Sequence, residues 1–140
     1  TYVDETFVCI YAESNFDFNL KNMILVHKRK KSLVTMSLYD YNFELQYGVI
    51  DTRKNGIITA WNEKPIINAK INMGCYIFEP KIFSSMPKNK QYGMDTLVKQ
   101  IISKKKRIDS FISKKPFIDI GDKEIYEKTN RMYSKNNKKK

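Results

Sequence analysis

Apolar and polar residues alternate along the chain in patterns typical of both strands and helices. Two continuous apolar runs have the composition of buried strands, and the first of them predicts a central strand covered on both faces of a sheet. Two more runs flank Asn55-Gly56, a dipeptide that strongly favours a tight hairpin turn. Strands are therefore predicted at residues 6–12, 32–40, 71–78, 107–113 and 116–120, with a hairpin inside 47–65.

Two segments in the first three quarters of the chain carry apolar residues at helical spacing. Residues 19–30 form an amphipathic pattern with Asn19 as the predicted N-cap. The only histidine, His27, falls on the apolar face of this pattern, which favours a core or helix-end histidine over a catalytic one. Residues 93–107 form the second pattern, with Asp95 in the first turn and lysines in the last, as the helix dipole favours.

A third helical pattern covers residues 122–136 near the end of the chain. Asp122 is its predicted N-cap, and its inward face is predicted to consist of Ile125, Tyr126, Thr129 and Met132. The segment after Tyr133 is rich in lysine and asparagine, as the ends of domains often are. The chain therefore divides into a domain over residues 1–133 and a basic, disordered tail over residues 134–140.

Strands alternate with helices along this domain, and one hairpin interrupts them. This order predicts an α/β fold with a mixed sheet. A length of 140 residues suits a single domain. With 41% apolar and 13% aromatic residues, the composition is that of a folded protein rather than a disordered one.

The formal net charge of +11 comes from 26 lysines and arginines against 15 acidic residues. Such an excess favours anionic partners, among them phosphorylated metabolites and nucleic acid. The charge is concentrated in lysine-rich runs at residues 27–31, 103–107 and 135–140. These runs fall at helix ends, far in sequence from the aromatic-rich strands that a nucleic-acid-binding module needs for base stacking, so that alternative is disfavoured.

The two cysteines, Cys9 and Cys75, lie in apolar runs without the spacing of metal ligands. Buried free thiols indicate a reducing compartment, and we expect a cytoplasmic protein. No apolar stretch reaches the length of a membrane span, so no membrane partner is expected. The chain starts at Thr1 and enters a strand almost at once, which suggests a piece of a longer protein.

Several short segments occur in a familiar order: "FVCIYAES", "YGVI", "NEKP", "INMGCYIFEP", "MDTLVKQI" and "FIDIGDKEIYEKTN". Together they resemble the C-terminal half of the sugar-1-phosphate nucleotidylyltransferases, the nucleoside-diphosphate-sugar pyrophosphorylases, from about Phe7 to Asn130. This resemblance implies a Rossmann-like mixed β-sheet flanked by helices, of the nucleotide-diphospho-sugar transferase type. It also implies a reaction that joins a nucleoside triphosphate and a sugar 1-phosphate into a nucleotide sugar, with release of pyrophosphate.

The resemblance implies a Mg²⁺ ion held by two carboxylates. Asp119 in "FIDIG" matches the later of the two family motifs, although a carboxylate in this place could instead cap the turn before Gly121. In the earlier motif, "YAE" stands where the family has "NGD", so that Glu13 takes the place of an aspartate. The longer side chain changes the geometry available to Mg²⁺, which is strict. Asp17 is an alternative carboxylate in a different register.

The resemblance also places residues around the sugar phosphate. Gly48 in "YGVI" and Gly74 in "INMGCY" match glycines beside the sugar ring, although a need for glycine at strand entry explains Gly48 about equally well. Asn72 matches a residue that binds sugar hydroxyls. In "NEKP", Glu63 matches an acceptor for sugar hydroxyls, and Lys64 matches the lysine that meets the sugar's phosphate. Lys64 is therefore the candidate catalytic residue. Tyr76 is interpreted as a packing residue.

The family's glycine-rich nucleotide-binding loop has no counterpart in this sequence, whose five glycines are widely separated. We therefore expect the N-terminal nucleotide-binding half to be absent and this chain alone to be inactive. Three alternatives stay open: a catalytically impaired regulatory or assembly relative, a phosphocholine or other phospho-alcohol acceptor, and the disfavoured nucleic-acid module. The resemblance implies homo-oligomers, and the sugar and base are left unassigned.

Overall fold

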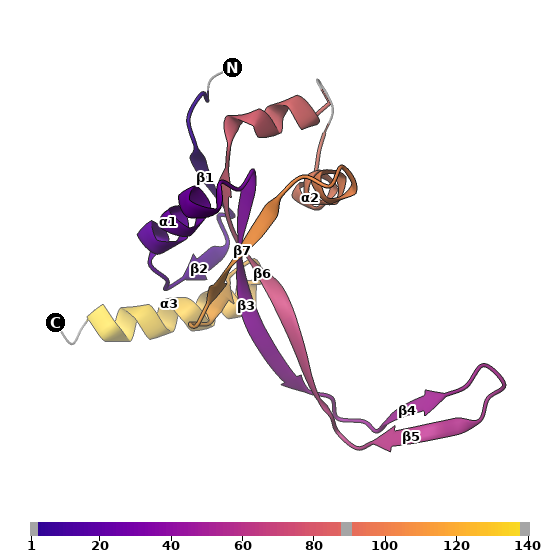
Figure 1. Ribbon diagram of the computed structural model, residues 1–140. Coiled ribbons are helices and arrows are strands. Elements are labelled where there is room, and N and C mark those ends of the chain that lie inside the picture. Colours follow the sequence, from indigo (N-terminus) through magenta and orange to yellow (C-terminus); the bar gives the residue numbers. More distant parts are fainter. Residues whose placement is uncertain (1–2, 88–90, 138–140) are drawn as a thin grey trace. The chain divides into compact units, whose positions relative to one another are not determined.

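The computed structural model describes residues 3–87 and 91–137, and the elements of that part of the chain are labelled in Figure 1. They are, in order, β1 (Phe7–Ile10), β2 (Ser14–Phe16), α1 (Leu20–Lys30), β3 (Val34–Glu44), β4 (Val49–Thr52), β5 (Ile58–Asn62), β6 (Ile66–Phe78), the 3₁₀ helix η1 (Pro80–Ser85), α2 (Met94–Ser103), β7 (Ile108–Ser113), β8 (Phe117–Asp119) and α3 (Lys123–Asn137).

Four of the strands form a mixed sheet in the order β1-β6-β3-β7. β1 runs antiparallel to β6, whereas β3 and β7 are parallel, with Val34 opposite Ile108. The long crossover that parallel strands require runs from β3 to β7 through β4, β5, β6, η1 and α2. Two separate ladders, β2 with β8 and β4 with β5, are antiparallel. The prediction of an α/β fold with a mixed sheet is therefore confirmed.

The prediction of a central strand at residues 6–12 is wrong for this chain. β1 pairs only with β6 and lies at the edge of the four-stranded sheet within the described ranges. A continuous apolar run indicates that both faces of a strand are covered by other elements. It does not indicate whether the strand has a neighbouring strand on one edge or on both. Side chains of β1 are accordingly half-buried, and Ile10 is 48% exposed.

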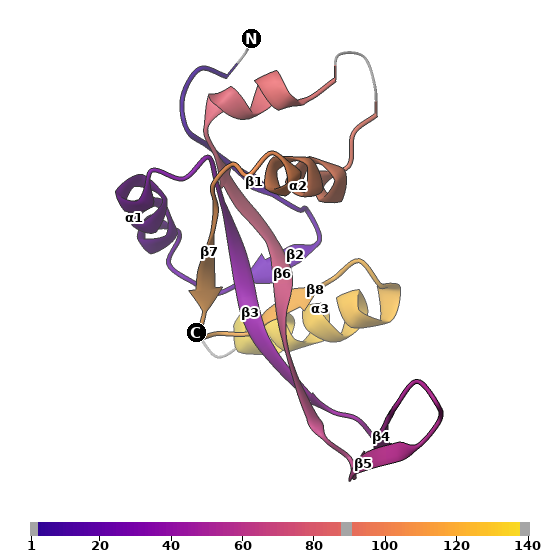
Figure 2. The ribbon, with the colours of Figure 1, turned by 45° about the vertical axis from the view of Figure 1, so that its right-hand side comes forward.

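Helices α1 and α2 cover opposite faces of this sheet (Figure 1, Figure 2). Alternate residues of β6 point to the two sides, as the pleat of a strand dictates. Tyr76 and Phe78 pack with Leu97 of α2 in one cluster, which Val34, Ile82 and Ile101 complete. Cys75 and Ile77 pack with Met23 of α1 in the other cluster. Both helices thus bury the apolar faces that their spacing predicts.

α1 begins and ends close to its predicted limits. Asn19 is the N-cap, and its Oδ1 accepts from the backbone N–H of Lys21 at 2.9 Å. His27 is 1% exposed, in the last turn, which confirms the interpretation as a core histidine at a helix end. Its Nδ1 lies 2.8 Å from Oγ1 of Thr35, and its Nε2 lies 3.0 Å from Oε1 of Glu79.

The two later helices differ in detail from the prediction. α2 ends at Ser103, so the lysines expected in its last turn follow the helix instead. Asp122 does cap α3, because its Oδ1 accepts from the N–H of Glu124 at 2.8 Å. Of the four residues expected to face inward from α3, only Thr129 is buried. α3 continues to Asn137, so residues 134–137 of the expected tail are helical, and residues 138–140 lie outside the described ranges.

Residues 40–71 form a second compact unit, separate from the unit made by residues 1–39 and 72–140. It contains the predicted hairpin, in which β4 pairs with β5 around Asn55-Gly56. Gly56 has φ +82°, a conformation that glycine adopts without strain. The N–H of Arg53 closes the loop by donating to the carbonyl of Ile57 at 2.9 Å. The hairpin prediction is therefore confirmed.

Both cysteines are free thiols, Cys75 buried and Cys9 half-buried, in agreement with the prediction. They lie on neighbouring strands, where Ile10 is the partner of Cys75 and Cys9 is the partner of Tyr76. Burial and the nearby Cys9 raise the pKa of Cys75 to about 11. The Cys75 thiol is therefore uncharged at neutral pH. None of the helices described is long and apolar enough to cross a membrane.

Candidate functional site

A tight turn connects β1 to β2 and carries the residues of "YAE". The N–H of Ser14 donates to the carbonyl of Tyr11 at 3.0 Å, which closes the turn. The N–H of Tyr11 donates in turn to the carbonyl of Gly74 at 2.8 Å, so the turn starts against β6. Glu13 is the last residue of the turn before β2, and it is exposed.

The ladder between β2 and β8 brings Glu13 next to the "FIDIG" segment. Ser14 is the register partner of Asp119, and the N–H of Ile120 donates to the carbonyl of Glu13 at 2.9 Å. A Cβ atom placed on Gly121 would lie 3.2 Å from Oδ1 of Asp119 and 3.8 Å from Cγ of Glu13. Oδ1 of Asp119 and the Cβ and Cγ atoms of Glu13, the two residues predicted to hold a metal, thus lie beside the same glycine.

Oδ1 of Asp119 accepts from the N–H of Gly121 at 3.0 Å. This is the turn-capping role that we considered as an alternative to metal binding, and the geometry allows both. Oδ2 of Asp119 has no hydrogen-bond partner among the described residues, and Asp119 as a whole is exposed to solvent. Asp119 therefore keeps one carboxylate oxygen available to a ligand.

The donor set at this place suits a hard divalent cation. Oxygen ligands from one or two carboxylates, completed by water and substrate phosphates, are what Mg²⁺ prefers in proteins. No group of three or more metal-ligating side chains occurs in residues 3–87 and 91–137, which excludes a cage built there from protein ligands alone. Asp17 lies at the other end of β2 and forms an ion pair with Lys115 at 2.6 Å, so it is a poor substitute for Glu13.

Gly74 is buried beneath the same turn, with φ +73°. A Cβ atom on this residue would lie 2.3 Å from Oγ of Ser14 and 3.0 Å from Cδ2 of Tyr11. The sequence suggested that Gly74 leaves room for a sugar ring. In the structure that room is filled by the turn itself, so the first role of Gly74 is to let Ser14 and Tyr11 close onto β6.

Asn72 lies two residues before Gly74, with its side chain exposed at the surface. Its Oδ1 accepts from the N–H of Gly74 at 3.1 Å, and its Nδ2 donates to the hydroxyl of Tyr76. A carboxamide has two N–H donors and two acceptor lone pairs, so one of each is left for a ligand. Burial, together with the hydrogen bond to Tyr11, raises the pKa of Tyr76 well above its usual range. Tyr76 is a packing residue, as predicted, that also holds Asn72.

In the unit formed by residues 40–71, Gly48 and Glu63 lie together. Val49 pairs with Asn62 in the antiparallel hairpin ladder. The residues next to this pair, Gly48 and Glu63, therefore lie opposite one another. Oε2 of Glu63 accepts from Nε1 of Trp61 at 3.0 Å, and a Cβ atom on Gly48 would lie 3.0 Å from that same oxygen. Any larger residue at position 48 would therefore displace the Glu63 carboxylate.

Lys64 is exposed and has φ +44°, in the left-handed region that non-glycine residues rarely adopt. It precedes Pro65, whose carbonyl accepts from the N–H of Leu45 at 3.0 Å. Strained residues of this kind persist where the surrounding structure imposes them, and they concentrate at functional sites. Lys31 and Lys105 share this conformation, so the backbone alone does not identify Lys64 as a site residue.

The predicted residues fall into two groups, one in each unit. Glu13, Gly74 and Asp119 meet around the turn between β1 and β2, with Asn72 two residues along β6. Gly48 and Glu63 meet at the base of the hairpin, next to Lys64.

The sequence interpretation missed the contributions of Ser14 and Trp61. Ser14 follows "YAE" directly, and Trp61 stands two residues before Glu63, so closeness to the motifs was the only available signal.

Comparison with known proteins gives a consistent result. The profile of the nucleotidyl transferase family matches residues 2–136. A D-glycero-α-D-manno-heptose 1-phosphate guanylyltransferase of Aneurinibacillus thermoaerophilus is 31% identical over 131 residues, which cover 91% of this chain and 56% of that protein. A UTP–glucose-1-phosphate uridylyltransferase of Synechocystis sp. is 31% identical over 99 residues, which cover 66% of this chain and 26% of that protein. The chain therefore spans between a quarter and just over half the length of these relatives.

Solved structures show the same fold. HddC from Yersinia pseudotuberculosis superimposes with a TM-score of 0.59 at 25% identity, over 92% of this chain and 56% of that chain. A putative glucose-1-phosphate thymidylyltransferase from Bacillus anthracis has a TM-score of 0.65 at 15% identity, over 92% of this chain and 55% of that one. At 15% identity the second similarity concerns the fold alone. The predicted nucleotide-diphospho-sugar transferase fold is confirmed, over about half of its full extent.

Proposed function

Since the chain belongs to the nucleotidyl transferase family, we propose that it supplies the sugar-phosphate and metal-binding part of a sugar-1-phosphate nucleotidylyltransferase. The observation that carries this proposal is the meeting of Glu13 and Asp119 beside Gly121. These two carboxylates come from segments more than a hundred residues apart in the sequence. Their convergence on one turn is what a reaction at a triphosphate needs, because a cation must neutralise the phosphates.

In the proposed reaction an oxygen of the sugar 1-phosphate attacks the α-phosphorus of a nucleoside triphosphate in line. A new bond forms between that oxygen and the α-phosphorus while the bond to the β-phosphate breaks, and pyrophosphate leaves with the electron pair. Little acid or base chemistry is needed, so the protein acts mainly through positioning and charge.

Each candidate residue has a role that its chemistry allows. Lys64 would neutralise the attacking phosphate, for which an ammonium group is a suitable point charge. Asn72 keeps one donor and one acceptor for sugar hydroxyls, and Glu63 provides acceptor oxygens. Gly48 would keep the Glu63 carboxylate in its place, and Gly74 would do the same for the turn that carries Glu13.

A divalent cation, which we propose to be Mg²⁺, would be held by Glu13 and Asp119 and would offset the charge of the triphosphate. Both residues are exposed, so water and phosphate oxygens can complete the coordination. The turn that carries Glu13 is closed by backbone hydrogen bonds, and the Asp119 carboxylate caps only the turn at Gly121. The geometry of the turn that carries Glu13 is therefore set before a cation binds.

Binding of a sugar 1-phosphate to the purified chain tests this proposal. Isothermal titration with α-D-glucose 1-phosphate and α-D-mannose 1-phosphate, each with MgCl₂, should give saturable binding that glucose alone does not compete away. Saturable binding of the free sugars with equal strength would overturn the proposal, because the phosphate would then contribute nothing. A complete absence of binding across both sugar phosphates would overturn it as well.

The isolated chain should not turn over, because no two of its glycines are close enough in sequence to form a triphosphate-binding loop. A pyrophosphate-release assay with the four nucleoside triphosphates, sugar 1-phosphates and MgCl₂ checks this expectation. Measurable pyrophosphate release above the background without protein would contradict it.

A second candidate is a catalytically impaired relative that keeps the fold for regulation or assembly. The observation in its favour is Glu13, whose extra methylene stands where the family has an aspartate. The two candidates predict different Mn²⁺ binding in the presence of a sugar 1-phosphate. If the chain belongs to an active enzyme, the wild-type sequence should bind Mn²⁺. If it belongs to an impaired relative, Mn²⁺ should bind only to the Glu13→Asp variant.

A further inference from the structure

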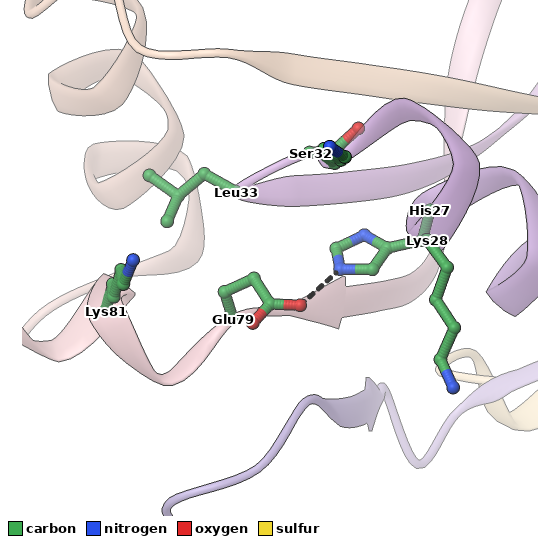
Figure 3. A pocket seen from close by; sticks show the side chains of 7 residues that line it. His27, Lys28, Ser32, Leu33, Glu79 and Lys81 are labelled. Atoms are coloured by element: carbon green, nitrogen blue, oxygen red, sulfur yellow. Dashed lines mark hydrogen bonds and ion pairs between the residues drawn. The ribbon is translucent and has the colours of Figure 1, made fainter.

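A hollow of about 400 Å³ lies between the end of α1 and the start of η1. Its walls carry the side chains of His27, Lys28, Lys31, Ser32, Leu33, Glu79 and Lys81, which are drawn in Figure 3, with all but Lys31 labelled. This volume is within the range of pockets that bind small molecules. The hollow is therefore large enough for a phosphorylated metabolite.

The hollow lies away from the candidate metal residues, at the C-terminal end of β6, whereas the turn with Glu13 contacts Gly74 within that strand. Oγ1 of Thr6, just before β1, donates to Glu79 at 2.8 Å, and Glu79 directly follows β6. The turn with Glu13 lies beyond the opposite end of β1, against Gly74. At about 3.3 Å per residue, the five residues from Gly74 to Glu79 span roughly 17 Å along the strand. A ligand in the hollow would thus be distinct from a substrate at the turn.

The charge at the hollow is strongly positive. Lys28, Lys31 and Lys81 form no ion pair with any residue in the described ranges. In Figure 3, Lys28 and Lys81 lie on either side of the pair formed by His27 and Glu79. Three lysines and one carboxylate line the hollow, which gives its lining an excess of two positive charges, and Lys28 also lines a neighbouring hollow with Asp4 and Glu5. A phosphate monoester carries about −1.5 to −2 at neutral pH, so its charge matches this excess.

The single carboxylate of the hollow is already engaged. Oε1 of Glu79 accepts from Oγ1 of Thr6 at 2.8 Å and from Nε2 of His27 at 3.0 Å. A carboxylate can only accept, so Nε2 of His27 carries a proton and points it at Glu79. Since His27 is buried and fixed by Thr35 on its other nitrogen, this carboxylate is held against the wall. The two hydrogen bonds offset part of the negative charge of Glu79, so this carboxylate repels a bound anion less than an unpaired carboxylate would.

The topology adds a second lysine run to the same end of the sheet. β3 and β7 are parallel neighbours, so the residues directly before them, Leu33 and Arg107, lie side by side, and the two lysine runs lead into these residues. The N–H of Leu33 donates to the carbonyl of Arg107 at 3.3 Å. Asp109 is shared between Lys30 and Arg107, so these two cations have only one acid between them. The positive potential therefore extends beyond the hollow.

Helix stability alone explains part of this charge, but not all of it. Basic residues in the last turn of α1 interact favourably with the helix dipole, whatever else they do. Lys81 belongs to η1 rather than to α1, and its position at the hollow has no such explanation. An extended nucleic acid would need exposed aromatic rings for stacking, and the walls of the hollow offer none. A small ligand fits these observations better.

We propose that this hollow binds the phosphate group of a small phosphorylated metabolite, through Lys28, Lys31 and Lys81, at a site separate from the candidate substrate site. The proposal does not depend on the proposed function, because no residue is common to the two. Both a sugar phosphate and a nucleoside monophosphate carry the required group.

Titration of the ¹⁵N-labelled chain, followed by ¹H–¹⁵N correlation spectra, tests the proposal. The probes are inorganic phosphate, glucose 1-phosphate and AMP, with KCl at the same ionic strength as the control. We expect saturable shifts of the amides at residues 28–33, 79, 81 and 82 with all three probes and none with KCl. The tighter of the two organic probes then identifies the metabolite class. Shifts with KCl of the same size, or none with phosphate, would overturn the proposal.

The double variant Lys28→Gln, Lys81→Gln should weaken phosphate binding at these amides at least about tenfold. Its matched control is Lys54→Gln, Lys123→Gln, which removes the same charge from two exposed lysines outside the hollow. Equal weakening in both variants would show that only net charge matters, and would refute a built site. Thermal unfolding followed by circular dichroism confirms that both variants keep the fold.

Discussion

Ser14 and Asp119 are register partners in the β2–β8 ladder, and through this pairing the carbonyl of Glu13 accepts from the N–H of Ile120 at 2.9 Å. Backbone groups alone therefore bring Glu13 and Asp119 close to one another from opposite ends of the sequence. A change of either carboxylate to a neutral side chain leaves these hydrogen bonds intact. The candidate metal residues can thus be tested without loss of the fold.

Asp119→Asn should weaken Mn²⁺ binding to the chain at least about tenfold. Substitution of residues that only hydrogen-bond to metal ligands typically lowers metal affinity about 10- to 100-fold. Loss of the charge of a ligand itself should lower the affinity at least as much. The asparagine oxygen can still accept from the N–H of Gly121, so the turn should persist. Electron paramagnetic resonance of free Mn²⁺ measures the affinity.

Asp122→Asn is the matched control for this substitution. It removes the same charge three residues away, and asparagine is as good an N-cap for α3 as aspartate is. Mn²⁺ affinity should change little. If Asp119→Asn and Asp122→Asn weakened Mn²⁺ equally, the carboxylate of Asp119 would have no special role.

Gly74→Ala should lower the free energy of unfolding by about 2–5 kcal/mol. The positive φ costs a non-glycine residue about 1–2 kcal/mol, and overpacking against Ser14 adds about 1–3 kcal/mol. Urea denaturation followed by circular dichroism measures the difference. Adding Ser14→Gly should recover the overpacking part but not the backbone part. A double variant no more stable than Gly74→Ala would show that Ser14 is not the obstacle.

Thr6→Ala should raise the pKa of Glu79 toward its ordinary value of 4.5, because the Thr6 hydrogen bond is the first cause of its lowered pKa and His27 the second. A carboxyl group whose pKa is lower in the folded state stabilises the fold above pH 4.5 and loses this effect as the pH falls through the lowered value. The variant should therefore lose stability at a higher pH than the wild type during acid titration. Titration of the ¹³C shift of the Glu79 carboxyl group measures the pKa, and an unchanged value would contradict the assignment.

Lys64→Gln should weaken binding of α-D-glucose 1-phosphate at least about tenfold, since it removes the charge proposed to meet the phosphate. Lys64→Arg should retain most of the binding. The backbone strain at φ +44° is about the same in all three chains, so stability should not differ. Isothermal titration measures the affinity, and an unaffected Lys64→Gln variant would remove this residue from the proposed site.

Local sequence signals predicted the elements well. Asn19 and Asp122 cap helices as expected, and Asn55-Gly56 forms the hairpin turn, because each acts through hydrogen bonds or dihedral angles within a few residues. The edge position of β1 was not predictable, since strand order depends on pairing between distant segments. β2, only three residues long, was also missed because a strand this short has no periodicity to detect.

The candidate site was predictable only as a set of residue types. The resemblance named Gly74 and Asp119, but the sequence could not show that Ser14 fills the space over Gly74 or that Asp119 also caps a turn. Trp61 was missed for a related reason, because its bond to Glu63 is a matter of side-chain geometry. Family motifs identify the positions of candidate site residues, whereas the structure shows which of their polar atoms have no protein partner and can bind a ligand.

The edge position of β1 has a consequence for the chain in solution. One side of this strand carries N–H and C=O groups that no described strand pairs, and such a row is a template for strands of other molecules. The net charge of +11 opposes that association through mutual repulsion. The Debye length, over which salt screens this repulsion, is about 10 Å at 0.1 M salt and only about 3 Å at 1 M. The isolated chain should thus stay dispersed in dilute buffer and assemble edge to edge as salt is added.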